Sequence, residues 1–329
     1  MKLQFITRVA AASAVALAMA GGMAMAQEVT LRGVSAFPQG TLYSLEFERF
    51  IKVINERGKG VLQINYLGGA PKTMDTFQVG NNTKSGIVDI ASMTGAYYTN
   101  VLPEADALKL IELPVAEFRK TPGFEYIQKL HNEKMNVFYL GKLYETHTFR
   151  IYLNKEINKA DFTGLKIRVT PIYRSLVEAL GGTAITSPPP EVYTMLERNT
   201  VDGYGWPLHG IFDFSWQKVT KYRLEHAFYS PDIQFLVNLS VWNKLNAAQK
   251  KLLQDTVAEF EKDNAANANT KKMIDDEKAK QAAAGIKEIV LPPAEAAKFQ
   301  KAAYDAGWAG VIKASPQHGA KLKELLSKK

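Results

Sequence analysis

Cysteine is absent from all 329 positions of the sequence. Without cysteine the chain has no disulfides, no thiolate ligands for a metal and no cysteine nucleophile. A protein of this length without disulfides depends on a sizeable hydrophobic core, and the 46% of hydrophobic residues allow one. The absence therefore excludes the small, disulfide-stabilised class of exported proteins.

Recognisable catalytic and metal-binding patterns are also missing. No two histidines stand at the spacing of metal ligands; they occupy positions 131, 147, 209, 226 and 318. No G-x-S-x-G nucleophile elbow occurs, and His131-Asn132-Glu133 lacks the second histidine of a zinc peptidase motif. A triad assembled from distant positions stays open, but no pattern supports one. We predict that the protein is not an enzyme and needs no cofactor or metal.

Beyond its N-terminus the chain has no apolar run long enough to span a bilayer. The N-terminus carries Lys2 and Arg8, an apolar run of 12 residues over 9–20, and the small residues Ala24-Met25-Ala26. This pattern is typical of a cleavable secretory signal peptide. We predict cleavage after Ala26, a mature chain of 329 − 26 = 303 residues, and a periplasmic location.

A strong excess of one charge is absent as well. The net charge is +8, or +6 without the two positive residues of the predicted signal peptide, and lysine is interleaved with glutamate and aspartate. Such mixed charge indicates a solvated surface rather than a nucleic-acid interface. We predict no nucleic-acid partner and, by default, a monomer.

Alternating strand and helix patterns begin soon after the predicted signal peptide. Three strand patterns within residues 29–91 are separated by helical patterns. This order is typical of an open α/β sheet, in which ligands bind at the carboxyl ends of the strands. Those ends carry Phe37, Gln39 and then residues 92–98, where we expect ligand contacts.

A second α/β block begins near residue 161. In residues 165–169 three apolar residues alternate with two cationic ones, so Arg168 lies on the face opposite the apolar residues of a short strand. Helical patterns follow, and then the polar-aromatic run DGYGWP at 202–207. We predict that Arg168 and Trp206 face one ligand across a cleft.

Residues 246–284 contain neither proline nor glycine. A continuous helix over these 39 residues would be roughly 58 Å long, which exceeds the width of a small domain. Two interpretations stay open: one helix laid across both blocks, or a surface helix that is frayed in its middle.

Arg168 also has two possible roles. A strand arginine is usually a surface charge or an ion-pair partner. The alternative is a bidentate clamp on a ligand carboxylate, because the planar guanidinium matches two oxygens. The residue pattern alone leaves both open.

Motifs around Arg168 resemble those of a known family. The main ones are DFTGLKIRV at 161–169, ALGG at 179–182, EVY at 191–193 and VDG at 201–203. Supporting matches are LG at 67–68, GIVDI at 86–90, LP at 113–114 and WNKL at 242–245. In this order they resemble the solute-binding proteins of tripartite ATP-independent periplasmic (TRAP) transporters, of the C4-dicarboxylate-binding (DctP) family.

The resemblance implies a two-domain α/β periplasmic binding protein, type II-like, with open mixed sheets, hinge strands and one long helix spanning both domains. It places residues 27–149 and about 239–270 in domain I, and 150–238 and about 271–329 in domain II, with the ligand cleft between them. It also implies ligand capture by domain closure and delivery to integral membrane permease subunits.

For the site, the resemblance implies that Arg168 holds the ligand carboxylate. Where sialic-acid-binding members have a second arginine this chain has Phe149, with Arg150 next to it. Where those members have an asparagine before a proline, it has Trp206. Charge and amide are thus exchanged for aromatic surface, which disfavours a sugar acid.

We therefore predict an organic acid, specifically a monocarboxylate with an apolar or aromatic body. Aromatic side chains would pack that body, while the polar contacts of the first domain align near Thr94 and Tyr97. Some relatives that bind 2-oxo acids also use a metal ion, but Gly205 stands where an acidic residue often occurs, so no metal is predicted. The predicted ligand-binding residues are Arg168, Trp206, Tyr97, Phe149, Phe37, Thr94, Gln39 and Tyr204.

Two other functions share part of this evidence. A ligand sensor for a membrane signalling receptor would have the same fold and cleft. An exported hydrolase would turn over ester or amide substrates. The leading prediction is the periplasmic solute-binding subunit of a TRAP transporter.

Overall fold

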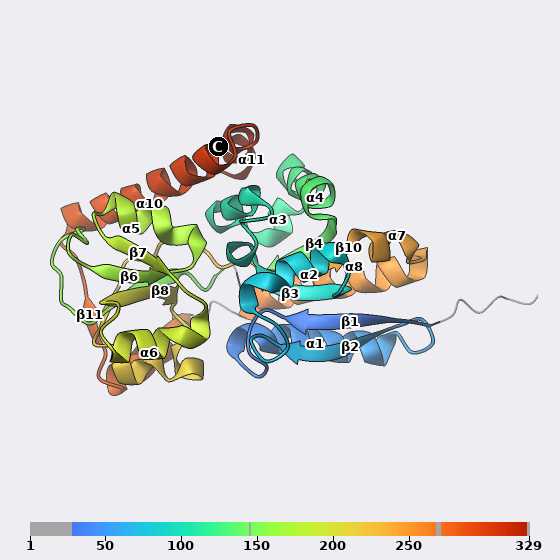
Figure 1. The fold of residues 1–329 in the computed structure, drawn as a ribbon, viewed down its shortest axis with the longest axis horizontal. Coiled ribbons are helices and arrows are strands. Elements are labelled where there is room, and N and C mark those ends of the chain that lie inside the picture. The colour runs from blue at the N-terminus through green and yellow to red at the C-terminus, as the bar shows by residue number, and fades with distance from the viewer. Residues whose placement is uncertain (1–27, 145, 268–270, 328–329) are drawn as a thin grey trace, which may run out of the picture.

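The structure, a computed structural model, describes residues 28–144, 146–267 and 271–327. The predicted signal peptide and its cleavage after Ala26 lie outside these residues. Two β-sheets, each with helices on its faces, lie side by side along the long axis of the molecule (Figure 1). This arrangement confirms the predicted α/β fold with two sheets.

The first sheet has five strands within the described residues, in the order β2-β1-β3-β10-β4. β1 runs parallel to β2 and β3, whereas β10 runs antiparallel to β3 and β4. β3 and β10 are buried at every position, which fits a sheet covered on both faces. The strands are β1 (Val29–Ser35), β2 (Leu62–Gly69), β3 (Ile90–Thr94), β4 (Val137–Leu143) and β10 (Ile233–Asn238).

The helices of the first sheet pack through regularly spaced apolar residues. In α1 (Leu42–Arg57) the buried residues Phe47, Phe50, Ile51 and Ile54 recur every three or four positions and so form one face. The other helices are α2 (Val79–Ser85), α3 (Val115–Phe118), α4 (Pro122–Met135), α7 (Leu239–Lys244) and α8 (Ala247–Asn267). Short 3-10 helices are η1 (Thr76–Gln78), η2 (Gly95–Tyr97) and η3 (Pro103–Leu110).

The second sheet has six strands in the part of the chain that the structure describes, in the order β11-β9-β5-β8-β6-β7. They are β5 (Phe149–Leu153), β6 (Lys166–Val169), β7 (Thr183–Thr186), β8 (Gly203–Pro207), β9 (Tyr222–Leu224) and β11 (Lys287–Ile289). The helices are α5 (Arg174–Ala179), α6 (Val192–Glu197), α9 (Lys271–Ala283) and α10 (Pro293–Ala314). The 3-10 helices are η4 (Pro171–Tyr173), η5 (Pro189–Glu191), η6 (Ile211–Phe214) and η7 (Trp216–Val219).

The predicted domain boundary at residue 238 is wrong. β10 pairs with β3 and β4, so residues 233–238 belong to the first sheet and the boundary lies before them. The C-terminal segment does not belong to the second sheet alone either, because α10 packs against both η3 and α5. α11 (Gly319–Leu326) packs on η3 and α4, so the last helix returns to the first half (Figure 1).

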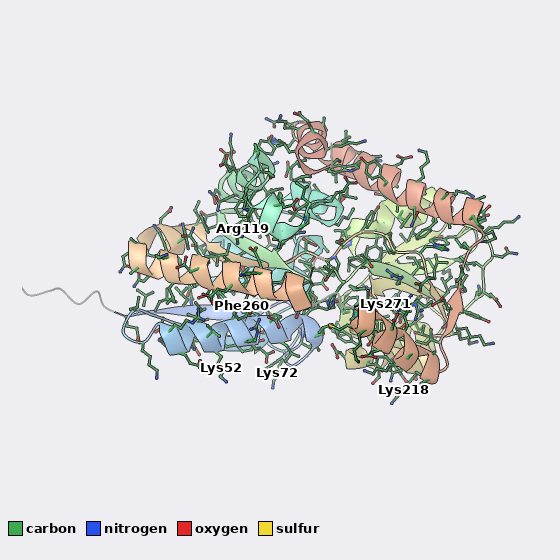
Figure 2. All side chains as sticks on the ribbon, turned by 180° about the vertical axis from the view of Figure 1, so that it is seen from behind. Lys52, Lys72, Arg119, Lys218, Phe260 and Lys271 are labelled. Atoms are coloured by element: carbon green, nitrogen blue, oxygen red, sulfur yellow. The ribbon has the colours of Figure 1, made fainter. Side chains whose placement is uncertain are left out.

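The Pro- and Gly-free stretch forms two described helices, α8 and α9, on either side of residues 268–270. α8 packs on α1 and β4, where the Phe260 ring lies 5.6 Å from that of Phe50. α9 begins at Lys271 beside the second sheet and runs in a different direction from α8 (Figure 2). The stretch reaches both halves of the molecule, but as two described helices of different direction rather than as one straight helix.

Candidate functional site

A small cavity lies where the ends of the two sheets meet. Its volume is about 20 Å³, enough for one ordered water. The first half contributes Phe37, Tyr43, Thr94, Ala96, Tyr97 and Ile233, and the second contributes Phe149, Thr170, Trp206, Pro207 and Pro231. Several of these residues stand at or just after the carboxyl ends of β1, β3, β6 and β8, the edge at which ligand contacts were expected.

Aromatic rings dominate the cavity wall. The Phe37 ring centroid lies 5.4 Å from that of Tyr97 and 5.7 Å from that of Tyr43. Tyr43 also meets Trp206 of the other half edge-on at 5.8 Å. Such offset and edge-on contacts are the favourable ones between aromatic rings. The wall of the cavity is therefore largely aromatic and apolar.

Five of the predicted site residues line this cavity: Phe37, Thr94, Tyr97, Phe149 and Trp206. Phe149 opens β5 and is the cross-strand partner of Pro207 on β8, which brings it to the same end of the second sheet as Trp206. The Thr94 hydroxyl is already engaged, because it donates to the Asp232 carboxylate at 2.9 Å. The cavity wall contains no histidine, aspartate or glutamate among its described lining residues.

Arg168 is completely buried behind this wall, on β6. Its Nε donates to the Ser187 backbone oxygen at 3.0 Å, and its Nη1 lies 3.2 Å from the Tyr173 hydroxyl, to which it donates. Nη2 also donates to the Ser187 carbonyl. These acceptors are neutral, and no carboxylate of the described residues forms an ion pair with Arg168. A buried guanidinium without an anion is costly unless a ligand supplies one.

Two observations connect Arg168 to the cavity. The ring of its partner Tyr173 lies 5.6 Å from the Phe149 ring, which lines the cavity. Burial raises the pKa of the Tyr97 hydroxyl, and the positive charge of Arg168 counteracts part of this shift. The guanidinium is thus close enough for its field to act on a cavity residue.

Two predicted contacts do not belong to the cavity. Gln39 is exposed, because the turn after Phe37 carries it away from the wall. Tyr204 is fully buried inside the second half: its hydroxyl lies 3.0 Å from Thr220 Oγ1, and its ring stacks on Tyr152 at 4.9 Å. On β8, the side chains of Tyr204 and Trp206 extend from the same strand, but only Trp206, at its end, reaches the cavity.

Arg150, next to Phe149, does not line the cavity. Its Nη1 donates to Thr148 Oγ1 at 2.7 Å and to the Phe149 carbonyl at 3.0 Å. Burial lowers the pKa of its guanidinium. Arg150 therefore does not replace the second arginine of the sugar-acid pattern.

Gly205 leaves no room for a side chain. A Cβ placed there would stand 2.6 Å from the Tyr173 ring, whose hydroxyl donates to the Gly205 carbonyl at 2.6 Å. An acidic residue at this position would displace the partner of Arg168. Among the described residues, no group of three or more His, Asp or Glu side chains is placed to hold a metal ion.

Two important residues carry no local sequence signal. Tyr43 lines the cavity from the first turn of α1. Asp232 is buried behind the wall and accepts hydrogen bonds from the Gly95 amide and the Thr94 hydroxyl, both at 2.9 Å. Asp232 thereby fixes the turn that leads to Tyr97, although it stands 138 positions from Thr94 in the chain.

The buried network around Asp232 predicts a specific pH dependence. Burial raises the pKa of the Asp232 carboxyl to about 6, whereas burial lowers the pKa of His131 to about 4. Between pH 4 and 6 the folded protein holds a proton on Asp232 that the unfolded chain has lost, so this residue makes stability fall as pH rises. Over the same range the unfolded chain holds a proton on His131 that the folded protein lacks, so His131 makes stability rise.

Replacing either Asp232 or His131 should leave the pH dependence of stability that the other residue contributes. In Asp232→Asn, acidification from pH 7 to 4.5 should increase the cost of the substitution by about 2 kcal/mol, since only the His131 contribution remains. His131→Gln should show the opposite trend. Urea unfolding at the two pH values measures both, and a cost of Asp232→Asn that is independent of pH would contradict the assignment.

Comparisons with known proteins identify a matching family profile and several similar chains. A family profile described as "Bacterial extracellular solute-binding protein, family 7" (DctP) matches residues 34–308. A "solute-binding protein" of Verminephrobacter eiseniae is 24% identical over 260 residues, covering 74% of this chain and 75% of that protein. The sialic acid-binding periplasmic protein SiaP of Vibrio cholerae is 31% identical over 139 residues, covering 40% of each chain.

Among solved structures, a TRAP periplasmic solute-binding protein from Desulfovibrio salexigens with bound orotic acid is similar in fold. The TM-score is 0.80 at 21% sequence identity, over 90% of this chain and 97% of that one. The described part of the present chain contains no helix that is both long and apolar enough to cross a membrane.

Proposed function

The chain belongs to bacterial extracellular solute-binding protein family 7, and on this premise we propose that it is the periplasmic solute-binding subunit of a TRAP transporter that captures an organic acid. The family is described as one of solute-binding proteins, and in this proposal the chain binds its acid without converting it. The acid we propose is a monocarboxylate with an apolar or aromatic body.

The observation that carries the proposal is the uncompensated charge of Arg168. Its guanidinium is completely buried, and its described partners are neutral oxygens. A ligand carboxylate would provide the missing anion in a geometry that matches the guanidinium fork. The pair would form away from water, where each hydrogen bond to charge is stronger. In this proposal Arg168 fixes the orientation of the ligand.

The body of the ligand follows from the wall of the cavity. Phe37, Tyr97, Phe149 and Trp206 present aromatic surface on several sides. A planar ring stacked among them gains both buried apolar area and ring–ring contacts. The orotic acid bound by the similar Desulfovibrio protein is a planar ring with one carboxylate, which supports this class. The partial similarity to a sialic acid-binding protein is the main argument for a sugar acid instead.

Binding would occur by closure of the two halves on the ligand. The cavity draws its wall from both sheets and has room for about one water, so a ligand must enter while the halves are apart. The halves we propose as domains are residues 28–148 with 233–267, and 149–232 with 271 to about 292. The C-terminal helices bridge the two, and the closed protein would deliver its acid to the membrane permease subunits.

A thermal-shift screen tests the proposal directly. The panel is orotate, benzoate, pyruvate, malonate and N-acetylneuraminate. A bound acid present at 100 times its dissociation constant should stabilise the protein by about 2.7 kcal/mol. We expect the ring-containing monocarboxylates to give the largest shifts. A shift with malonate or N-acetylneuraminate alone would refute the aromatic monocarboxylate, and no shift at all would refute organic-acid capture.

A further inference from the structure

The first turn of α1 is not capped by its own residues. Thr41 stands at the N-cap, but its side chain caps no amide of the helix; its hydroxyl donates to the Pro38 carbonyl at 2.6 Å. The Ser44 and Leu45 amides donate to the Thr41 carbonyl, which leaves the Leu42 amide without a partner in the helix. The first turn also contains no acidic residue that would favour the positive end of the helix dipole.

The missing cap comes from the other half of the molecule. The Leu42 amide donates to Oδ2 of Asp213, 171 positions away, at 2.7 Å. Asp213 lies on η6, in the loop that follows β8. A second bond runs in parallel, from the Tyr43 hydroxyl to the His209 carbonyl at 3.3 Å. Two neighbouring residues of α1 are thus bonded to one loop of the second half.

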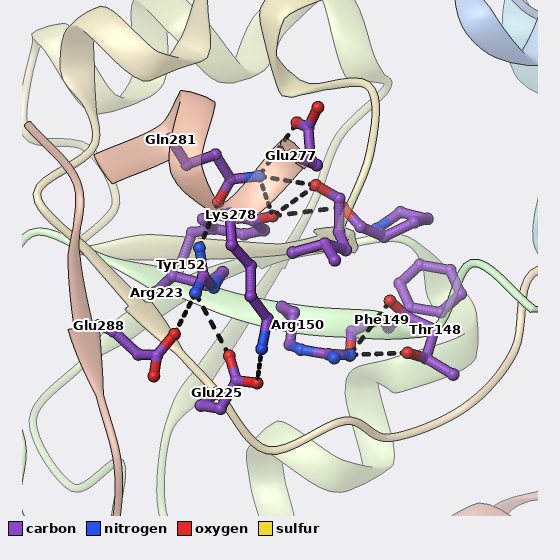
Figure 3. A network of polar contacts seen from close by, with 12 residues as sticks. Thr148, Phe149, Arg150, Tyr152, Arg223, Glu225, Glu277, Lys278, Gln281 and Glu288 are labelled. Carbon is purple, nitrogen blue, oxygen red and sulfur yellow. Dashed lines mark hydrogen bonds and ion pairs between the residues drawn. The ribbon is translucent and has the colours of Figure 1, made fainter. Parts of the chain in front are cut away.

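That loop is fixed firmly to the second sheet. Gln281 of α9 donates to the Leu208 carbonyl at 2.7 Å and accepts from Arg223 at 2.9 Å. The Tyr152 hydroxyl donates to the Leu208 carbonyl as well, at 3.2 Å. Figure 3 shows Gln281 bonded to both Tyr152 and Arg223. Because the loop is anchored in this way, a bond from Asp213 to α1 holds the second half against the first.

We propose that Asp213 is a closure latch: its carboxylate caps α1 only when the two halves are closed, and so contributes to ligand affinity without touching the ligand. This inference rests on the proposed function, because closure matters only if a ligand is captured between the halves. The residues beside the latch, Tyr43 and Trp206, line the cavity, so the latch closes directly over the ligand.

The latch acts through the equilibrium between open and closed forms. For a ligand that binds only the closed form, the apparent dissociation constant equals the intrinsic one divided by the fraction of protein that is closed. A smaller closed fraction therefore means weaker binding. Loss of a carboxylate cap at a helix N-terminus typically costs about 1 kcal/mol, which corresponds to about fivefold in an equilibrium. The largest effect expected from Asp213 alone is therefore about fivefold in the dissociation constant.

The test compares the wild type with Asp213→Ala and Asp213→Asn. Calorimetric titration uses orotate, benzoate and pyruvate, and hydrogen exchange follows the peptide that contains residues 42–45. Asp213→Ala should weaken binding of an acid that the wild type binds by about fivefold and should speed exchange at the start of α1. Asp213→Asn keeps an accepting oxygen without the charge, so its effect should be smaller.

Asp161→Ala is the matched control. The Asp161 carboxylate also accepts a backbone amide, that of Thr163 at 2.9 Å, but both residues belong to the second half and lie away from the cavity. This variant should leave the dissociation constant unchanged. Unchanged affinity and exchange in Asp213→Ala would overturn the latch. If the wild type binds none of the three acids, the proposed monocarboxylate fails by itself, and the exchange of residues 42–45 alone decides whether Asp213 caps α1.

Discussion

Arg168→Met should weaken binding of the organic acid by at least about 100-fold while the melting temperature of the ligand-free protein changes little. The substitution removes the charge that would pair with the ligand carboxylate in a site closed to water. Truncating one partner of a buried charge pair costs about 2–5 kcal/mol, because the other charge is left buried and unpaired. In this protein the unpaired charge would be the ligand itself.

The stability of the ligand-free protein should change little because two terms offset each other. The substitution would leave the Ser187 carbonyl without the donors that it now has, at a cost of about 1 kcal/mol. It also removes a completely buried cation for which no described carboxylate compensates, and this is favourable. Arg168→Lys keeps the charge but loses the planar fork, so it should bind the acid weakly rather than not at all.

Arg174→Met is the matched control for this experiment. Arg174 lies on the neighbouring α5, is exposed, and donates to Glu178 at 3.1 Å and to Thr186 Oγ1 at 2.8 Å. Its loss should leave the affinity unchanged. Calorimetry with the acid identified in the screen measures both variants. An affinity of Arg168→Met within a few-fold of the wild type would rule out the carboxylate clamp.

The position of the cavity was predictable because it follows from strand order. Phe37 and Tyr97 come just after β1 and β3, and in an α/β sheet such positions meet at one edge. Trp206 stands near the end of β8, one residue before Pro207. For these residues, local pattern and fold class together were sufficient, and each lines the cavity.

The surroundings of Arg168 were not predictable from its strand. Alternation places Arg168 on the same face as the exposed Lys166, which favours a surface charge. In the structure Ile167, Arg168 and Val169 are all buried, since β6 lies between β7 and β8 and is covered on both faces. A covered strand loses the alternating pattern that an exposed face produces. Only the resemblance to a known family pointed to the role that we propose.

Residues brought together from distant positions were also missed. Asp232 contacts Thr94, and Asp213 contacts Leu42, across 138 and 171 positions respectively. A single sequence contains no signal that couples such pairs. The predictions for Gln39 and Tyr204 were wrong because closeness in sequence to a cavity residue does not place a side chain in the cavity. Each stands two positions from a cavity residue, but a turn carries Gln39 into solvent, and Tyr204 lies deeper in the core of the second half.

Trp206→Ala should reduce both stability and affinity, and the affinity should fall most for acids with a ring. The Trp206 side chain is 3% exposed and packs edge-on against Trp216 at 4.9 Å and Phe214 at 5.7 Å. Truncating a buried tryptophan to alanine typically costs about 3–5 kcal/mol of unfolding free energy. Trp206→Phe keeps a ring at this point and should lose much less.

For binding, the argument depends on the division of work between Arg168 and Trp206. The proposed clamp holds the carboxylate, which every acid has, whereas Trp206 packs the body, which differs between acids. Losing the ring contact should therefore weaken orotate or benzoate by roughly tenfold or more, about 1.4 kcal/mol, and pyruvate by less. The ratio of the two affinities measures specificity separately from stability.

Trp242→Ala is the control that separates a loss of stability from a loss of affinity. Trp242 is also buried, and its ring stacks on Phe138 at 3.8 Å, in the first half and away from the cavity. It should lose a similar amount of stability and keep both affinities. If Trp206→Ala weakens ring-containing acids and pyruvate by the same factor, then Trp206 acts only through its contact with Tyr43 across the closed halves. Specificity would in that case have to reside in Phe37, Tyr97 and Phe149, the remaining aromatic residues of the wall that were predicted to pack the ligand.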